Sequence, residues 1–217
     1  MKRILISTLS AFVLIACGGE QKTETKTGDT LAVEETKAQV CTYTYQHDST
    51  RVEWIAYKFT EKTGVKGRFR YTEVNNTTSS TSMYDVLKGA AISIPIDSLE
   101  TNDKGRNEKI VKFVFGKMNN TKTITGTLKG FAEDGSSATL VIKMNEIEKE
   151  INAPASWEGE KVTLKTDINL GDFNALSSVD AITNACKENH KGSDGIAKVW
   201  PDVTIIVSTT LKKECAE

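Results

Sequence analysis

The feature that most constrains the fold is a pair of alternating apolar runs between residues 49 and 69. Val52, Trp54 and Ala56 recur at every second position, which places them on one face of a strand. A polar turn follows, and in the next run Gly67 stands between two apolar residues on the same face. Two such runs joined by a short turn predict a β-hairpin, and we expect it to begin an antiparallel sheet around an apolar interior.

The same alternation recurs to the end of the chain and is separated by Gly, Asn, Asp and Ser, which favour turns. Pro95 in one of these runs indicates a sheet edge or a bulge. Helical signals are few. We therefore predict an all-β fold, a closed eight-stranded antiparallel barrel that is lipocalin-like, with room for one small ligand. The predicted strands after the hairpin are 90–96, 122–131, 138–144, 149–155, 162–170 and 203–211, and the predicted short helices are 83–88, 104–115 and 175–189.

The N-terminus has the pattern of an export signal. Lys2 and Arg3 precede an apolar run that is too short to span a bilayer, so residues 1–16 are predicted to be a signal peptide. Residues 14–17, Leu-Ile-Ala-Cys, resemble a bacterial lipobox, which implies cleavage before Cys17 and a lipid anchor on it. The alternative is a plain secretory signal in which Cys17 is incidental. Gly18 is not the aspartate associated with inner-membrane retention, so we expect anchoring at the outer membrane of a bacterial cell envelope.

Residues 17–40 are polar and contain almost no large apolar side chain, which predicts a flexible tether before a barrel domain at 41–217. With Cys17 lipidated, three thiols remain and allow one disulfide, and an exported protein can keep it. In a closed antiparallel barrel the first and last strands are neighbours, which favours Cys41–Cys215. Pairing of Cys186 with either of the other two stays open.

Three segments together resemble the YceI-like family. TRVEWIAYKFTEKTGVKGRF (50–69) is similar to its opening hairpin, IPIDSLETNDKGRNEKIVKFVF (94–115) to its middle signature, and ITGTLKG (124–130) to a later strand. The segment 172–199 resembles the lipoprotein variant of the family. The resemblance implies a lipocalin-like barrel that binds polyisoprenoids or isoprenoid quinones outside the cytoplasm. The chain departs from the family pattern at Ser49, Lys58, Asn107 and Lys109, so the resemblance does not specify the polar head of the ligand.

We predict that the inward faces of the strands bind the apolar tail of a long ligand, a polyisoprenoid, an isoprenoid quinone or an acyl lipid. Small residues at Ala56, Gly67 and Gly126 indicate space that a filled core would occupy with bulk. The alternative is a filled core in an envelope-stress or surface-interaction lipoprotein without a ligand. The predicted interior residues are Val52, Trp54, Ala56, Val65, Gly67, Phe69, Ile92, Ile94, Ile124, Gly126, Leu128, Leu140, Ile142, Leu164, Ile205 and Val207.

The sequence favours a binding protein over an enzyme. His47 and His190 lie in no recognisable nucleophile or metal motif, and Cys186 with His190 makes only a pair, short of a metal site. We therefore expect no catalytic residue, no metal and no cofactor. The formal charge of −1 lacks the basic excess of nucleic-acid-binding proteins, so we expect no nucleic-acid partner.

Overall fold

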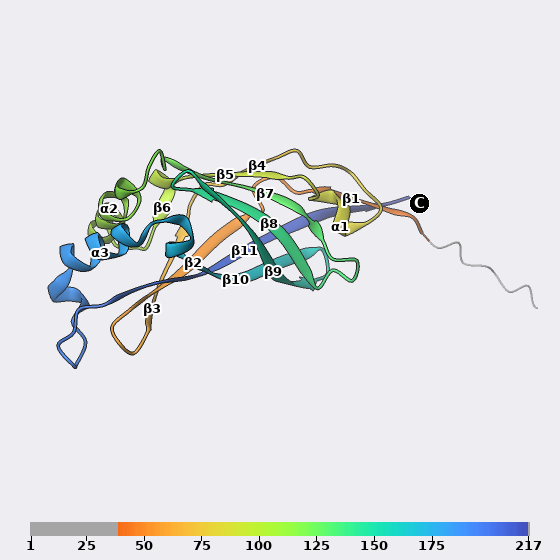
Figure 1. The fold of residues 1–217 in the computed structure, drawn as a ribbon. Coiled ribbons are helices and arrows are strands. Elements are labelled where there is room, and N and C mark those ends of the chain that lie inside the picture. Colours follow the sequence, from red (N-terminus) through yellow and green to blue (C-terminus); the bar gives the residue numbers. More distant parts are fainter. Residues whose placement is uncertain (1–38, 217) are drawn as a thin grey trace, which may run out of the picture. The chain divides into compact units, whose positions relative to one another are not determined.

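The computed structural model describes residues 39–216, which form one curled antiparallel sheet and a few short helices (Figure 1). The predicted signal peptide 1–16, Cys17 and the tether up to residue 38 lie outside the described residues. The strands are β1 (Cys41–Tyr45), β2 (Arg51–Lys58), β3 (Thr63–Phe69), β4 (Glu73–Asn75), β5 (Ala91–Pro95), β6 (Leu99–Glu100), β7 (Thr123–Phe131), β8 (Ser137–Met144), β9 (Ile147–Glu158), β10 (Lys161–Asn169) and β11 (Val199–Cys215). The helices are α1 (Met83–Val86), α2 (Lys104–Phe113) and α3 (Leu176–Ala185), and the 3₁₀ turns are η1 (Ile96–Ser98), η2 (Phe115–Lys117), η3 (Leu170–Phe173) and η4 (Lys187–His190).

The sheet is antiparallel as predicted, but the closed eight-stranded barrel is wrong. Hydrogen-bonded neighbours follow the order β4-β5-β7-β8-β9-β10-β11-β2-β3-β6, and β1 pairs with β11 in addition. The ladder changes partner just after Pro95. The N–H of Ile96 still donates to the carbonyl of Lys122 at 3.0 Å, and the turn η1 then directs the chain to β3, with which β6 pairs. The sheet therefore curls around its interior without a continuous ring of ladder bonds.

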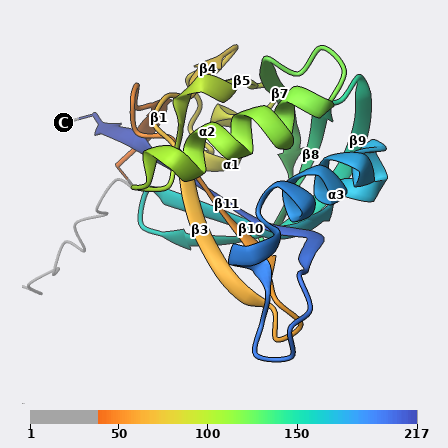
Figure 2. The ribbon, with the colours of Figure 1, turned by 90° about the vertical axis from the view of Figure 1, so that its left-hand side faces the viewer.

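The opening hairpin is formed by β2 and β3, with Trp54 directly opposite Gly67. The three predicted helical segments contain α1, α2 and α3. Helix α2 begins where Asp103 accepts a hydrogen bond from the backbone N–H of Arg106 at 2.9 Å, an N-cap that satisfies one free donor of the first turn. None of the helices in residues 39–216 combines the length and the apolar character needed to cross a bilayer. Helices α2 and α3 lie together across one end of the sheet (Figure 2).

The other end of the sheet is closed by a packed apolar cluster. Val86 and Leu87, at the end of α1, are buried in one apolar cluster with Leu128 of β7, and α1 contacts β1 and β7. Ala138 of β8 and Ala153 of β9 are fully buried in the same cluster. The interior is therefore filled by this cluster near α1.

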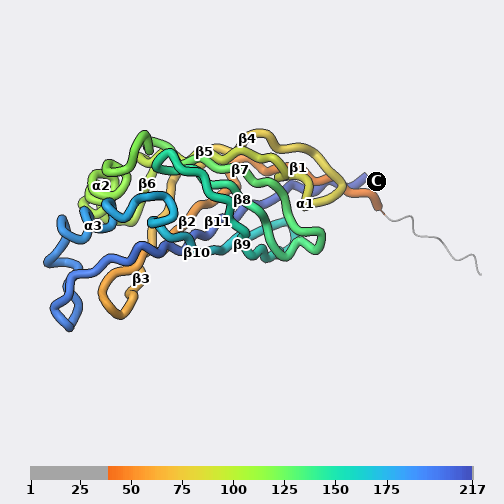
Figure 3. Tube along the Cα trace, in the orientation of Figure 1, coloured from red at the N-terminus to blue at the C-terminus, as the bar shows by residue number. Residues whose placement is uncertain are grey.

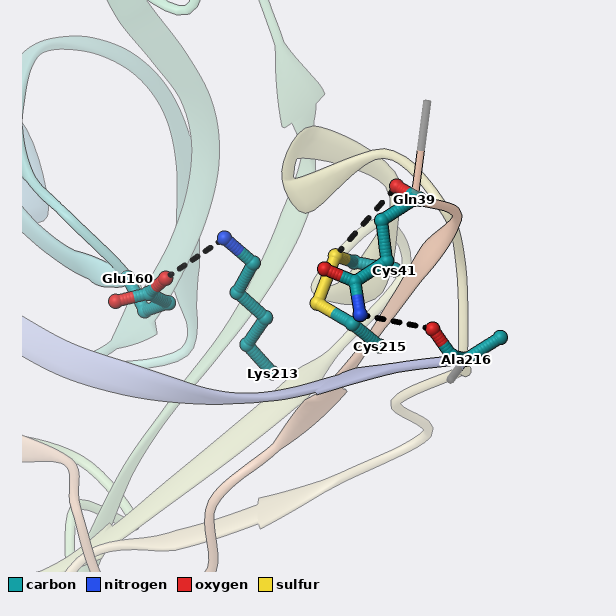
Figure 4. Close-up of a disulfide and its surroundings, with 6 residues drawn as sticks. All are labelled: Gln39, Cys41, Glu160, Lys213, Cys215 and Ala216. Atoms are coloured by element: carbon teal, nitrogen blue, oxygen red, sulfur yellow. Dashed lines mark hydrogen bonds and ion pairs between the residues drawn. A yellow bond between two sulfur atoms is a disulfide. The ribbon is translucent and has the colours of Figure 1, made fainter. Parts of the chain in front are cut away.

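The start and the end of the described residues lie side by side, because the first strand, β1, pairs with the last strand, β11. The sequence analysis did not predict β1. Strand β1 pairs with the last part of β11 (Figure 3). The register of this pair places Cys41 opposite Cys215. These cysteines form a disulfide, and Cys186 is a buried free thiol, so the other two pairings are not made. Around the bridge, Gln39 donates to the carbonyl of Ala216 at 2.8 Å (Figure 4). The bridge closes a loop of 174 residues.

Candidate ligand-binding site

The curled sheet encloses a cavity of about 450 Å³ that extends to the α2–α3 end. This volume lies within the range of roughly 300–1,000 Å³ that small-molecule sites occupy. Its wall is built from the inward faces of the strands, and every predicted interior residue except Gly67 lines it. Several of these side chains, such as Ile92, Ile142 and Ile205, remain partly accessible although they point inward. A filled core would bury them, so the wall has the form of an apolar binding site.

Gly67 corrects one part of the sequence interpretation. A Cβ atom at this position would lie 2.1 Å from Cζ2 of Trp54, because the indole ring lies across the glycine from the facing strand. The space left by the missing side chain is thus occupied by Trp54 and not by open cavity. Gly126 differs, since its Cβ would meet the backbone oxygen of Val141 at 3.1 Å and no side chain of residues 39–216 within 4 Å. Only the second glycine leaves space free in the wall.

The polar groups of the inner wall are mostly bonded to one another. The hydroxyl of Thr50 lies 3.0 Å from that of Tyr45 and 2.9 Å from that of Thr209, and Ser49 lies 2.9 Å from Thr209. Thr50 and Thr209 line the cavity, but their hydroxyls are already paired. The indole N–H of Trp54 is buried and has no acceptor within the described chain. The inner wall therefore presents mainly apolar surface to a long tail, with the Thr50 and Thr209 hydroxyls paired and the Trp54 N–H covered by neighbouring atoms.

The mouth of the cavity is polar and is assembled from three separate segments. Lys58 continues the inward alternation of β2, and its neighbour Phe59 donates its backbone N–H to the carbonyl of Lys198 at 2.9 Å. Lys198 donates in turn to the carbonyl of His190 at 3.1 Å, which holds η4 beside the end of β2. Trp200 donates from its indole N–H to the carbonyl of Phe59 at 2.7 Å. This chain of bonds brings His190 and Trp200 to the mouth next to Lys58.

Helix α2 supplies the remaining side of the mouth with Arg106 and Lys109. Nδ1 of His190 is buried and has no hydrogen-bond partner among residues 39–216. Burial lowers the pKa of His190, and the positive charges of Lys58 and Lys109 lower it further, because both disfavour a protonated imidazole. The sequence analysis named Lys58 and Lys109 only as departures from the family pattern, and it did not predict that they lie at the mouth with Arg106 and His190. The signal at Lys58 was the same every-second-residue spacing that identified Val52, Trp54 and Ala56.

A family model described as the YceI-like domain matches residues 43–211. The chain belongs to the YceI-like family. This confirms the resemblance carried by the hairpin, the middle signature and the later strand. No curated protein sequence matches the chain.

Two solved structures share the fold of this YceI-like domain. A polyisoprenoid binding domain from Saccharophagus degradans, implicated in plant cell wall breakdown, is 10% identical, with a TM-score of 0.55 over 82% of this chain and 100% of that one. BcnA from Burkholderia cenocepacia is 12% identical, with a TM-score of 0.51 over 78% of this chain and 99% of that one. At such low identity the likeness concerns the fold alone.

The YceI-like domain shows no arrangement that would hold a metal ion within the described residues, since no three His, Cys, Asp or Glu side chains cluster there. Cys186 and His190, weighed as a metal pair from their spacing, are linked through the backbone, where the N–H of His190 donates to the carbonyl of Cys186 at 3.0 Å. His190 is thus placed at the mouth by η4, and its imidazole lines the cavity.

Proposed function

We propose that this YceI-like protein binds one long apolar lipid with its tail in the cavity. The observation that carries the proposal is the 450 Å³ cavity whose inward apolar side chains stay partly accessible. Length matters for the energy balance. Burying about 400 Å² of apolar tail gives roughly 10 kcal/mol, while association opposes binding by about 4–15 kcal/mol. A short apolar molecule would gain little, and a long tail can bind well.

The tail is that of a polyisoprenoid, an isoprenoid quinone or an acyl lipid. Among these three tails, we favour an isoprenoid chain, because the protein belongs to the YceI-like family and shares its fold with the Saccharophagus polyisoprenoid binding domain. The inner wall is largely apolar, and the hydroxyls of Thr50 and Thr209 are already paired, which suits a tail that is apolar along nearly all of its length. The protein acts by binding, without chemical conversion of the lipid.

We place this binding domain in the bacterial cell envelope, attached by a lipid on Cys17 and separated from the membrane by the tether 17–40. The lipobox-like sequence before Cys17 supports the anchor, and Gly18 supports the outer membrane. An exported location also suits the Cys41–Cys215 disulfide, which persists under oxidising conditions. Tether and anchor would keep the domain close to a lipid supply.

Native mass spectrometry of the full-length protein, extracted gently from membranes, tests the binding proposal. We expect an added mass equal to one lipid per chain, beyond the anchor on Cys17, and organic extraction then identifies that lipid. Chains that carry only the anchor, and that take up no polyprenol on incubation, would instead support an interaction lipoprotein with no ligand.

A further inference from the structure

The mouth of the cavity has an excess of hydrogen-bond donors without matching acceptors. Lys58 and Lys109 line it and have no ion-pair partner in residues 39–216. Nδ1 of His190 is buried there without a partner. An ammonium group only donates hydrogen bonds, and a neutral imidazole can place its proton on Nδ1. The two ammonium groups can only donate to the oxygens of a bound group, and the neutral imidazole adds one donor and one acceptor.

The carboxylates nearby do not neutralise the two lysines. Asp103 lines the mouth, but it forms an ion pair with Arg106 at 3.5 Å and caps α2. Glu53 also borders the cavity, but it is exposed and stands five residues from Lys58 on β2, about 16 Å away along an extended strand. The excess positive charge at the mouth therefore belongs to Lys58 and Lys109.

Carboxylates just outside the mouth are also engaged. Asp202 pairs with Lys62 at 3.1 Å, Asp194 accepts from the hydroxyl of Thr60 at 2.7 Å, and Glu61 accepts from Ser193 at 3.2 Å. These contacts hold the two loops at the mouth together. They leave Lys58 and Lys109 without an acidic partner among residues 39–216, although the Lys58 ammonium lies 4.4 Å from the centroid of the Phe59 ring.

Burial and the two lysine charges both lower the pKa of His190, which shows that Lys58 and Lys109 act on the same buried position. Deeper in the cavity, the hydroxyls of Thr50 and Thr209 are already paired with each other and compete little for a polar head. A lipid with its tail inside would therefore place its head among Lys58, Lys109 and His190.

We propose that the lipid bound by this protein has an anionic head, a phosphate or a carboxylate, held at the mouth by Lys58, Lys109 and His190. This inference rests on the proposed function, because it assumes that the tail occupies the cavity. Charge-assisted hydrogen bonds from lysine to phosphate or carboxylate oxygens are stronger than neutral ones. The mouth thus selects among lipids by head group, and the apolar wall accepts the tail.

The test compares lipids that share a tail and differ in the head. Quenching of tryptophan fluorescence measures the affinity of the full-length protein for each lipid. The first pair is geranylgeranyl phosphate and geranylgeraniol, and the second pair is palmitate and hexadecanol. The variant Lys58→Gln/Lys109→Gln removes both free charges. Its matched control is Lys66→Gln/Lys165→Gln, two exposed strand lysines that do not line the cavity.

We expect the wild type to prefer an anionic lipid over its alcohol by about 10-fold or more, and the Lys58→Gln/Lys109→Gln variant to lose about 10- to 100-fold in affinity for the anion alone. The control should retain the preference. In the wild type, added salt should weaken binding of the anion and leave the alcohol unaffected. Histidine NMR adds a second readout, because an anion at the mouth should raise the pKa of His190 and leave the chemical shifts of His47 unchanged.

A preference for geranylgeranyl phosphate assigns the head as a phosphate, and a preference confined to palmitate assigns it as a carboxylate. Both results support the inference if the preference depends on Lys58 and Lys109. Equal binding of anion and alcohol by the wild type, or a preference that persists in the double variant, would overturn the anionic head while the cavity proposal stands. Failure of all four lipids to bind would instead remove the proposed function itself.

Discussion

Substitution of Gly67 by alanine tests how the hairpin builds the cavity wall. The added Cβ would lie 2.1 Å from Cζ2 and 2.4 Å from Cε2 of Trp54, both far inside van der Waals contact, so the indole must move. Forcing an extra carbon into a packed site costs about 1–3 kcal/mol. We therefore expect Gly67→Ala to lower the free energy of unfolding by that amount, although alanine in a strand is ordinarily favoured over glycine.

Urea unfolding followed by far-UV circular dichroism measures this loss, and tryptophan fluorescence reports whether the indole becomes more exposed. A double-mutant cycle with Trp54→Leu isolates the clash, because the cost of Gly67→Ala should nearly vanish once the ring is gone. Gly105→Ala is the control, since its Cβ would meet Asp103 at an ordinary 3.5 Å. An equal cost of Gly67→Ala in both backgrounds would refute the close approach of Trp54 and glycine.

Three further predictions concern the termini and the mouth. Replacing Cys41 and Cys215 by serine should lower the free energy of unfolding by about 5 kcal/mol in the chain-entropy model, measured by guanidinium unfolding, whereas Cys186→Ala should have a smaller effect; similar losses would argue against the bridge as the main constraint. Because the pKa of His190 is lowered in the folded protein, protonation favours the unfolded state, so stability should be constant above about pH 7 and fall as the pH drops below histidine's ordinary pKa of about 6.5. Thermal unfolding of wild type and His190→Gln across this range checks the sign, and identical profiles would contradict it. Cys17→Ser should move the protein from the membrane to the soluble fraction on cell fractionation, and continued membrane association would exclude a lipid on Cys17 as its anchor.

Alternation along the chain was sufficient to predict most of the sheet, because period-two spacing is a local property. It predicted the hairpin and the strands β7, β8 and β10 close to their observed bounds, but it gave only the middle of β11, as 203–211. It missed β1, and it missed β4 and β6, which are too short to show a period. It also could not show that the ladder stays open, because the change of partner after Pro95 depends on which strands the sheet brings together.

The cavity wall was predictable for the same reason, since inward residues alternate with outward ones. Gly67 shows the limit of this reasoning. The space left by a missing side chain can be open, or a neighbouring side chain can fill it. At Gly67, the position of the Trp54 ring on the facing strand shows that the space is filled. The mouth depends on three segments far apart in the sequence, among them Lys58 and His190, so no local pattern could unite them.

The most direct test of the central claim is lipid uptake by an Ala56→Trp variant. Ala56 lines the cavity, so an indole there should occupy the space proposed for the tail while the sheet still folds. Ala132→Trp, at an exposed position away from the cavity, is the matched control. The account predicts one bound polyprenol or acyl lipid per chain for the wild type and the control, and none for Ala56→Trp with an unchanged circular dichroism spectrum. Undiminished uptake by a folded Ala56→Trp variant would contradict it.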